Sequence, residues 1–120
     1  MPSTIYNIET SRNMNIDNTK AQMRKGLLEL CVLSIIDKVE MYPSDIIRKL
    51  KDAKMIVVEG TLYPLLNRLL KGELVSYNWK ESNSGPPRKY YSITAEGRTV
   101  LKELKVSWKD MQSAVNAALS

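Results

Sequence analysis

The side chains best suited to chemistry lie on one face of a helix that we predict near the middle of the chain. Asn67 and Arg68 are the residue types that make paired hydrogen bonds to adenine and guanine, respectively, in the major groove of DNA. The hydroxyls of Thr61 and Tyr63, near the start of this helix, can bind phosphate with help from the helix dipole. The face presents mainly small or polar side chains: Gly60, Thr61, Pro64, Asn67, Arg68 and Lys71. Such faces are usually just solvated, so this candidate DNA-binding set depends on its surroundings.

Two further cations, Arg88 and Lys89, follow the sequence Gly85-Pro86-Pro87 in a predicted loop. The prolines would stiffen the tip of the loop, and the cations would then bind backbone phosphates or enter the minor groove. Alternatively, the two cations protect the edge of a sheet against pairing with another sheet. Their place after the polar helix favours the first interpretation.

Composition argues against catalysis and metal binding. The 120 residues include no histidine, which excludes a histidine general base, an imidazole metal site and Ser-His or Cys-His catalytic pairs. The single cysteine, Cys31, allows neither an internal disulfide nor a thiolate cluster, which fits a reducing, cytoplasmic setting. The sequence has no glycine-rich phosphate loop and no metal-ligand spacing. We therefore expect a protein that is not an enzyme and that needs no cofactor or metal.

The charge balance suggests a polyanionic partner. Lys and Arg number 18 against 13 Asp and Glu, which gives a net charge of +5 and a pI near 9.4. The longest apolar stretch, Leu27–Ile36, contains Glu29 and Ser34 and is too short to span a bilayer. Nucleic acid is therefore a better candidate partner than a membrane.

The helices that would position these residues follow from the spacing of apolar side chains. A first helix is expected from about Thr19 to about Lys38, and its apolar residues occupy almost the whole circumference. A second helix starts at Pro43-Ser44-Asp45, and a third runs from about Glu59 to about Lys71, with Gly72 as its stop. In the third helix the leucines recur at i, i+3, i+4, i+7 and i+8: Leu62, Leu65, Leu66, Leu69 and Leu70.

Two strands and a last helix complete the order. Residues 74–79 and 89–93 alternate aromatic or β-branched residues with polar ones, as strands do. The turn residues between them, 82–87, form a loop too long for a tight hairpin. Thr94 is the expected N-cap of the last helix, whose apolar residues recur at heptad spacing: Leu101, Leu104, Trp108, Met111, Val115 and Ala118. This seam needs apolar surface to pack on, and the first helix is the obvious candidate.

Three residues on the first and last helices are candidates for a dimer pore or effector site: Trp108, Glu29 and Met111. A tryptophan midway along a pairing helix is more often a packing anchor than a ligand contact, although two copies could stack a flat molecule in a symmetric dimer. Glu29 interrupts the most apolar segment of the chain. It is either an exposed partner of Lys25 or part of an interface or effector cavity.

The order of elements is helix, helix, helix, strand, strand, helix, which is a mainly α fold with a small β-hairpin, in the α+β class. This order describes a winged helix-turn-helix with an additional C-terminal helix that forms a dimer. We expect three parts: a flexible N-terminal lead at residues 1–18, a DNA-binding domain at 19–94 and a dimerisation helix at 95–120.

The motifs also resemble those of a known family. Gly60–Leu69 is similar to the recognition-helix motif of PadR-type transcriptional regulators. Pro87–Thr94, followed by Gly97, resembles their wing motif and the start of their last helix, and Arg24–Leu30 resembles their first helix. The resemblance covers roughly residues 20–110, and the two longer motifs stand in the right order.

The resemblance implies a dimeric winged-helix repressor that reads a dyad-symmetric operator and is released by a small molecule. It also implies that Trp108 lines a pore between subunits, where some members bind flat aromatic compounds. The chain departs from the family at Pro43-Ser44, where a glycine-aromatic pair is usual, and at Gly85-Pro86-Pro87, where the wing tip is usually more basic.

The sequence therefore predicts a cytoplasmic, sequence-specific DNA-binding transcriptional regulator that acts as a homodimer and as a ligand-responsive repressor. Its expected partners are double-stranded DNA, a second copy of the chain and a small aromatic effector. The alternative is a winged-helix module that docks on acidic protein surfaces without binding DNA. Competition by duplex DNA would separate the two hypotheses.

Overall fold

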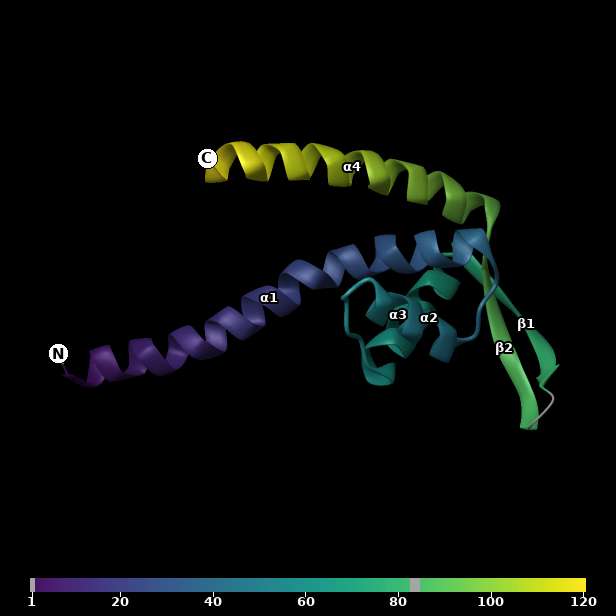
Figure 1. Cartoon of the computed structure of the whole chain (residues 1–120), viewed down its shortest axis with the longest axis horizontal. Coiled ribbons are helices and arrows are strands. Elements are labelled where there is room, and N and C mark those ends of the chain that lie inside the picture. The colour runs from purple at the N-terminus through teal and green to yellow at the C-terminus, as the bar shows by residue number, and fades with distance from the viewer. Residues whose placement is uncertain (1, 83–84) are drawn as a thin grey trace.

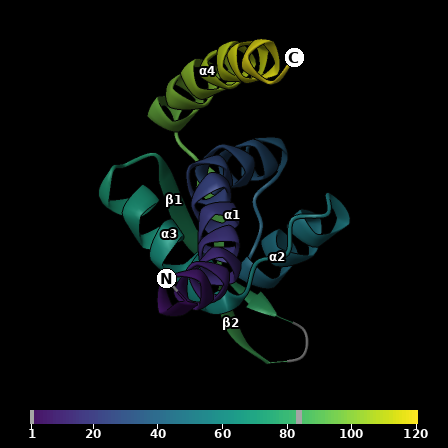
Figure 2. The same ribbon diagram turned by 90° about the vertical axis from the view of Figure 1, so that its left-hand side faces the viewer.

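The computed structural model describes residues 2–82 and 85–120. Its elements, in chain order, are α1 (Pro2–Lys38), α2 (Pro43–Asp52), α3 (Glu59–Lys71), β1 (Val75–Ser82), β2 (Gly85–Ile93) and α4 (Ala95–Leu119) (Figure 1). The predicted fold class is confirmed, because three helices, an antiparallel hairpin and a further helix form a winged helix-turn-helix with a C-terminal extension. Helices α2 and α3 lie on one side of α1, and α4 lies on the other (Figures 1 and 2).

Helix α1 begins much earlier than the sequence indicated. It starts at Pro2 and not near Thr19, so the predicted start of the first helix is wrong, while Met1 lies outside the described residues. The separation of residues 1–18 as a flexible lead stays a prediction. The asparagines of this segment have low helix propensity, which favoured a non-helical lead. However, proline is tolerated in the first turn of a helix, and no other proline or glycine precedes Gly26, so nothing interrupts the hydrogen-bond ladder.

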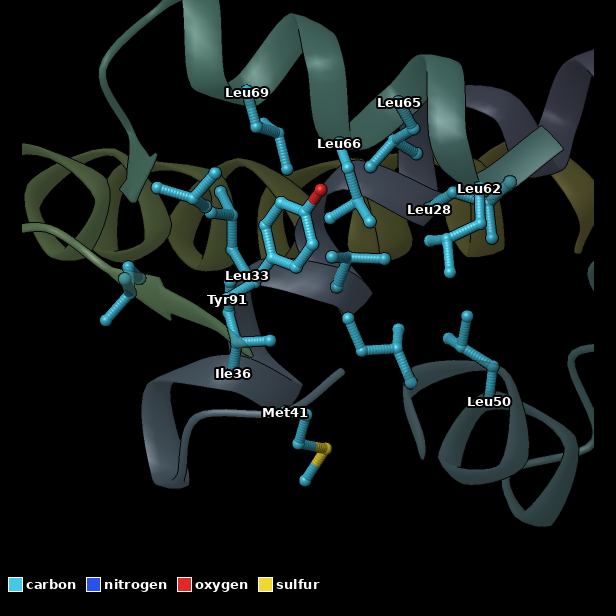
Figure 3. Close-up of a cluster of buried hydrophobic side chains, with 14 of the residues drawn as sticks. Leu28, Leu33, Ile36, Met41, Leu50, Leu62, Leu65, Leu66, Leu69 and Tyr91 are labelled. Carbon is cyan, nitrogen blue, oxygen red and sulfur yellow. The ribbon is translucent and has the colours of Figure 1, made fainter. Parts of the chain in front are cut away.

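The hydrophobic core lies where α1, α2, α3 and the base of the hairpin meet (Figure 3). Four leucines of α3 are buried and confirm the predicted inward stripe, of which Leu70 is only half-buried: Leu62, Leu65, Leu66 and Leu69. They pack with buried residues of the two preceding helices: Leu28, Val32, Leu33, Ile36, Ile46 and Leu50. Because the apolar side of α3 is used entirely for this core, its polar side faces outward.

Strands β1 and β2 form a longer hairpin than the sequence predicted. The ladder extends from the pair Val75 and Ile93 to the pair Ser82 and Gly85, so the expected loop at 82–87 is wrong for residue 82 and for residues 85–87, while residues 83–84 lie outside the described part of the chain. Successive N–H positions of a strand point to opposite edges, so the unpaired edge of β2 accommodates only one of the adjacent residues Pro86 and Pro87. A shift in register between Lys80 and Ser82 accommodates the extra residue on the proline side.

The segment between α1 and α2 is attached to the base of the hairpin. Met41 and Tyr91 exchange two backbone hydrogen bonds, in which Met41 N donates to the Tyr91 oxygen at 3.0 Å and Tyr91 N to the Met41 oxygen at 2.7 Å. Tyr42 then precedes Pro43, the first residue of α2, in an extended conformation. The start of α2 is thereby held beside the wing.

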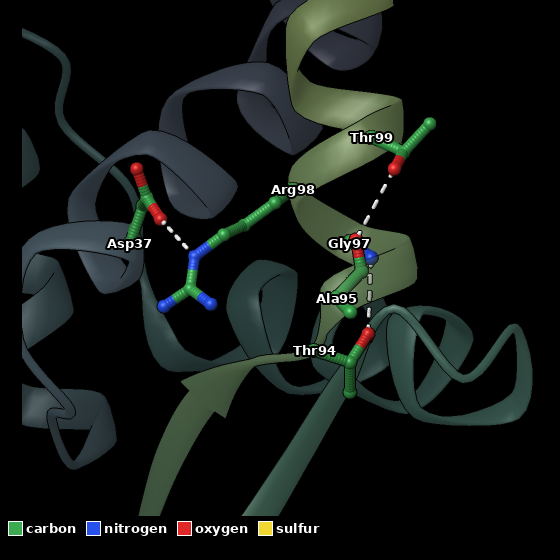
Figure 4. A network of polar contacts seen from close by, with 6 residues as sticks. All are labelled: Asp37, Thr94, Ala95, Gly97, Arg98 and Thr99. Atoms are coloured by element: carbon green, nitrogen blue, oxygen red, sulfur yellow. Dashed lines mark hydrogen bonds and ion pairs between the residues drawn. The ribbon is translucent and has the colours of Figure 1, made fainter.

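Helix α4 is joined to the fold at its first turns (Figure 4). Thr94 is the N-cap, as predicted: its Oγ1 accepts from the Gly97 backbone N–H at 3.0 Å and donates to the Glu73 carbonyl at 2.8 Å. A Cβ at Gly97 would lie 2.1 Å from the carbonyl oxygen of Leu74, the residue before β1, so only glycine allows this approach of α4 to the base of the hairpin. Arg98 Nε also donates to the carboxylate of Asp37 in α1 at 2.9 Å.

Candidate nucleic-acid interface

The outward face of α3 carries the candidate DNA-binding residues of this helix. All of them are exposed: Thr61, Tyr63, Pro64, Asn67, Arg68 and Lys71. The helix begins after the extended residue Val58, whose carbonyl accepts the backbone N–H groups of Thr61 and Leu62. The structure nevertheless does not gather the candidates into one site, because five of them line two different cavities and Lys71 lines neither of the two.

One flank of α3 faces the hairpin. Tyr63 and Asn67 line a cleft of about 600 Å³ whose opposite wall includes Trp79, Arg88 and Lys89. The first residues of α2 form a further side of this wing cleft. The structure therefore brings together two of the helix candidates and both of the predicted wing cations.

The other flank of α3 faces α1. Thr61, Pro64 and Arg68 line a groove of about 580 Å³, and Arg24 and Lys25 contribute from α1. The guanidinium of Arg68 lies on this side because it is paired with a carboxylate: its Nη2 donates to Glu29 Oε1 at 3.2 Å. One of the two interpretations of Glu29 made it a partner of Lys25, one turn away, whereas its partner in the structure is Arg68 on α3.

The wing cations rest on aromatic rings. The guanidinium carbon of Arg88 lies 4.8 Å from the ring centroid of Tyr42. Lys89 Nζ lies 4.4 Å from the ring centroid of Tyr77 and 5.4 Å from that of Trp79. Such contacts fix the direction of a cation while its N–H groups remain able to bind an anion. These cations are therefore oriented beside the cleft and still available to phosphate.

Burial raises the pKa values of two side chains, Tyr91 and Cys31. Burial raises the pKa of the Tyr91 hydroxyl, with smaller contributions from Tyr63 and Tyr77, so Tyr91 stays neutral at the base of the wing. Burial likewise raises the pKa of the Cys31 thiol, which fits the interpretation of Cys31 as a small apolar residue of the helix bundle. Among the described residues, no group of acidic side chains and cysteine is arranged to hold a metal ion.

The three candidates for a pore or effector site do lie together. Trp108, Met111 and Glu29 line one groove of about 730 Å³ between α1 and α4. Trp108 is 39% exposed and Met111 is 54% exposed in the single chain, so the seam predicted for the last helix is only covered near its start, at Leu101 and Leu104. We call this the α1–α4 groove.

Comparison with known proteins shows which family has this architecture. A family profile described as "Transcriptional regulator PadR-like family" matches residues 32–103, which include α3, the hairpin and the start of α4. The chain belongs to the PadR-like family. The resemblance noted in the sequence is thereby confirmed, and the chain is a DNA-binding transcriptional regulator of a family whose members are generally not enzymes.

Solved structures of PadR-like proteins resemble this chain closely. A PadR-like transcription factor from Bacteroides fragilis is 56% identical, and the match covers 82% of this chain and 96% of that one with a TM-score of 0.71. A PadR-like transcriptional regulator from Bacillus cereus is 43% identical over 82% of this chain and 97% of its own, with a TM-score of 0.74. A PadR family transcriptional regulator from Eggerthella lenta is 30% identical over 92% and 97%, with a TM-score of 0.81.

The sequence did not indicate the aromatic rings that hold the wing cations. Tyr42 and Tyr77 hold the wing cations, and Trp79, which is 61% exposed, lies beside Lys89. The alternation of Tyr77 and Trp79 along one strand was a usable signal, because it places both rings on one face beside their cross-strand neighbours. Tyr42 carried no such signal, since it meets Arg88 only through the fold.

The described helices do not meet the requirements of a bilayer. None of them combines the length and the apolar composition that crossing a membrane would take.

Proposed function

We propose that this PadR-like regulator is a homodimeric repressor that binds a dyad-symmetric operator and is released by a small aromatic molecule. In this proposal α3 enters the major groove and each wing follows the flanking backbone. The observation that carries the proposal is the wing cleft, where Tyr63 and Asn67 of α3 face Arg88 and Lys89 of the hairpin. Base-reading and phosphate-binding side chains then share one surface.

The chemistry of that surface fits duplex DNA. The Asn67 amide can accept and donate to one adenine, and the cations of the wing can bind phosphates on either side of the base that is read. The net charge of +5 adds a general attraction to a polyanion. Because the target is chromosomal DNA, we place the activity in the cytoplasm, as the sequence suggested.

A second copy of the chain is the proposed partner of α4. Beyond Leu104 this helix exposes large apolar residues along one seam: Trp108, Met111, Val115 and Leu119. An apolar stripe of this length on an otherwise polar helix is typical of a self-complementary interface. This supports residues 95–120 as the dimerisation helix and residues 19–94 as the DNA-binding part.

The α1–α4 groove is the proposed effector site. It is lined by the flat indole of Trp108, the adaptable Met111 side chain and the carboxylate of Glu29, which suit a flat aromatic molecule with a cationic group. The same carboxylate accepts a hydrogen bond from Arg68 of α3. A ligand that engages Glu29 would therefore compete with Arg68, and this competition connects the groove with the DNA-binding helix.

The proposal is tested by titrating a labelled duplex from the region upstream of the chain's own coding sequence, with sedimentation of the free protein in parallel. We expect a dimer that binds this duplex more tightly than a shuffled duplex of equal length. A monomer at concentrations where DNA is bound would contradict the dimer, and absence of binding at low salt would contradict the DNA-binding role. Release by aromatic cations, scanned in the same titration, tests the effector site.

A further inference from the structure

We propose that Trp79 is a DNA-contact residue of the wing, and that its indole packs on the deoxyribose next to a phosphate bound by Lys89. The inference rests on the proposed function and deepens it, because Trp79 is not among the candidate DNA-binding residues. Trp79 is one of the largest exposed apolar side chains of the described residues, and the structure gives it a defined position.

The position of Trp79 is defined by its neighbours on the hairpin. It pairs directly with Lys89 across the ladder, and Tyr77 lies on the same face, two residues earlier in β1. The rings of Trp79 and Tyr77 meet edge to face, with centroids 6.2 Å apart and planes at 89°. The indole is therefore supported without being buried, which leaves one side of it for a partner.

The face of the hairpin that carries Trp79 is turned toward α3. Trp79 and Lys89 line the wing cleft, and Tyr63 and Asn67 line it from the side of α3. Any DNA strand that α3 brings into this cleft thus meets the indole and the ammonium next to each other. Trp79 is not needed to cover the hydrophobic core. Tyr91 and Val75 already cover it at the base of the hairpin, and both are buried.

The pairing of an indole with an ammonium matches the backbone of duplex DNA. That backbone alternates an apolar sugar with an anionic phosphate, so a ring and a cation side by side can contact both. Lys89 Nζ lies over the Tyr77 ring at 4.4 Å, close enough to be oriented by it. A partner protein would also suit an exposed tryptophan, and DNA is favoured here because Arg88 adds a second cation to the same cleft.

The direct test uses the fluorescence of Trp79. The chain has two tryptophans, so the contribution of Trp79 is the part of the emission change that a Trp79→Tyr variant, which keeps Trp108, loses. The unmodified protein and this variant are titrated at low salt with a random-sequence duplex and with the upstream duplex, while the anisotropy of a label on the DNA records binding. We expect the Trp79 emission to change in step with the anisotropy. Binding without any change in Trp79 emission would overturn this inference alone, whereas no binding by the unmodified protein would overturn the proposed function as well.

Affinity measurements separate the ring from the charge. Trp79→Ala is expected to weaken binding about tenfold, and Trp79→Phe to retain affinity within about twofold, because a ring still covers the sugar. Lys89→Gln is expected to lower the slope of log affinity against log salt by about one, whereas Trp79→Ala leaves the slope unchanged. Asn78→Ala, on the same strand but the opposite face, is the matched control and should bind normally. Equal affinity of Trp79→Ala and Asn78→Ala, with both variants folded by circular dichroism, would contradict the contact.

Discussion

The two flanks of α3 differ in what their polar side chains already contact. On the wing flank, Tyr63 and Asn67 face a cleft whose cations rest on aromatic rings and keep their N–H groups available. On the α1 flank, Arg68 is already paired with Glu29, a residue that also lines the α1–α4 groove. One helix therefore combines a flank that is ready for DNA with a flank that is connected to the proposed effector site. The predictions below test this difference from the largest expected effect to the smallest.

Gly97→Ala should disturb the wing flank through the base of the hairpin. The added Cβ would lie 2.1 Å from the Leu74 oxygen, so β1 or α4 must move. We expect the free energy of unfolding to fall by roughly 2–3 kcal/mol, measured by urea denaturation. Gly26→Ala is the control, because a Cβ there meets no atom within 4 Å, and it should be neutral or slightly stabilising. Equal stability of the two variants would contradict the close approach.

Asn67→Ala removes the proposed base-reading group of the wing flank. If Asn67 makes a paired hydrogen bond to one adenine, operator affinity should fall by about 1–3 kcal/mol, while affinity for random duplex is nearly unchanged. The measurement is competition between operator and random duplex in one anisotropy assay. A uniform loss on both duplexes would make Asn67 a phosphate contact and would remove specificity from this flank.

Glu29→Gln should release Arg68 from the α1 flank. The pair is half-exposed, so its energy is at most about 1 kcal/mol, and we expect DNA affinity to rise by up to about fivefold when Arg68 becomes available. In an Arg68→Ala background the same change should have no effect, which a double-mutant cycle measures. Asp37→Asn, which breaks the Asp37–Arg98 pair of the same kind but away from α3, is the control. A gain that survives in the Arg68→Ala background would disprove the connection.

Ligand binding in the α1–α4 groove should change the fluorescence emission of Trp108 and not that of Trp79. In a Trp79→Tyr variant, where Trp108 is the remaining tryptophan, we expect flat cationic or phenolic aromatics to quench the emission. Addition of Glu29→Gln should weaken this quenching for cationic compounds by less than tenfold, because one half-exposed carboxylate is lost. A broad panel that leaves Trp108 unaffected would count against the effector site.

Local sequence signals predicted those parts of the structure that depend on local physics. The bounds of α3, its buried leucines and the Thr94 cap were predicted, because helical periodicity and capping involve residues within a few positions of one another. The start of α1 was missed for the opposite reason: its asparagines are locally unfavourable, yet nothing in residues 3–25 breaks the helix. The predicted loop at 82–87 was too long, because adjacent prolines favour a turn, whereas an unpaired edge together with a shift in register accommodates them within β2.

The sequence predicted which residue types form the candidate site, but it did not predict which of them lie together. The exposed residues of α3 were identified correctly, whereas their division between two flanks depends on where the wing and α1 pack. The pair of Arg68 with Glu29 joins residues 39 positions apart, and no spacing rule connects them. Likewise, Tyr42 meets Arg88 only because the Met41–Tyr91 bridge holds the start of α2 beside the wing.

The central claim is that α3 and the wing together bind duplex DNA through one cleft. It is tested most directly by measuring the affinity of the unmodified protein and of Lys89→Gln for the upstream duplex across a range of salt concentrations. The account predicts tight binding that weakens steeply with salt, and a slope that is shallower by about one in the variant. Absence of binding at low salt, or identical slopes for the two proteins, would contradict it.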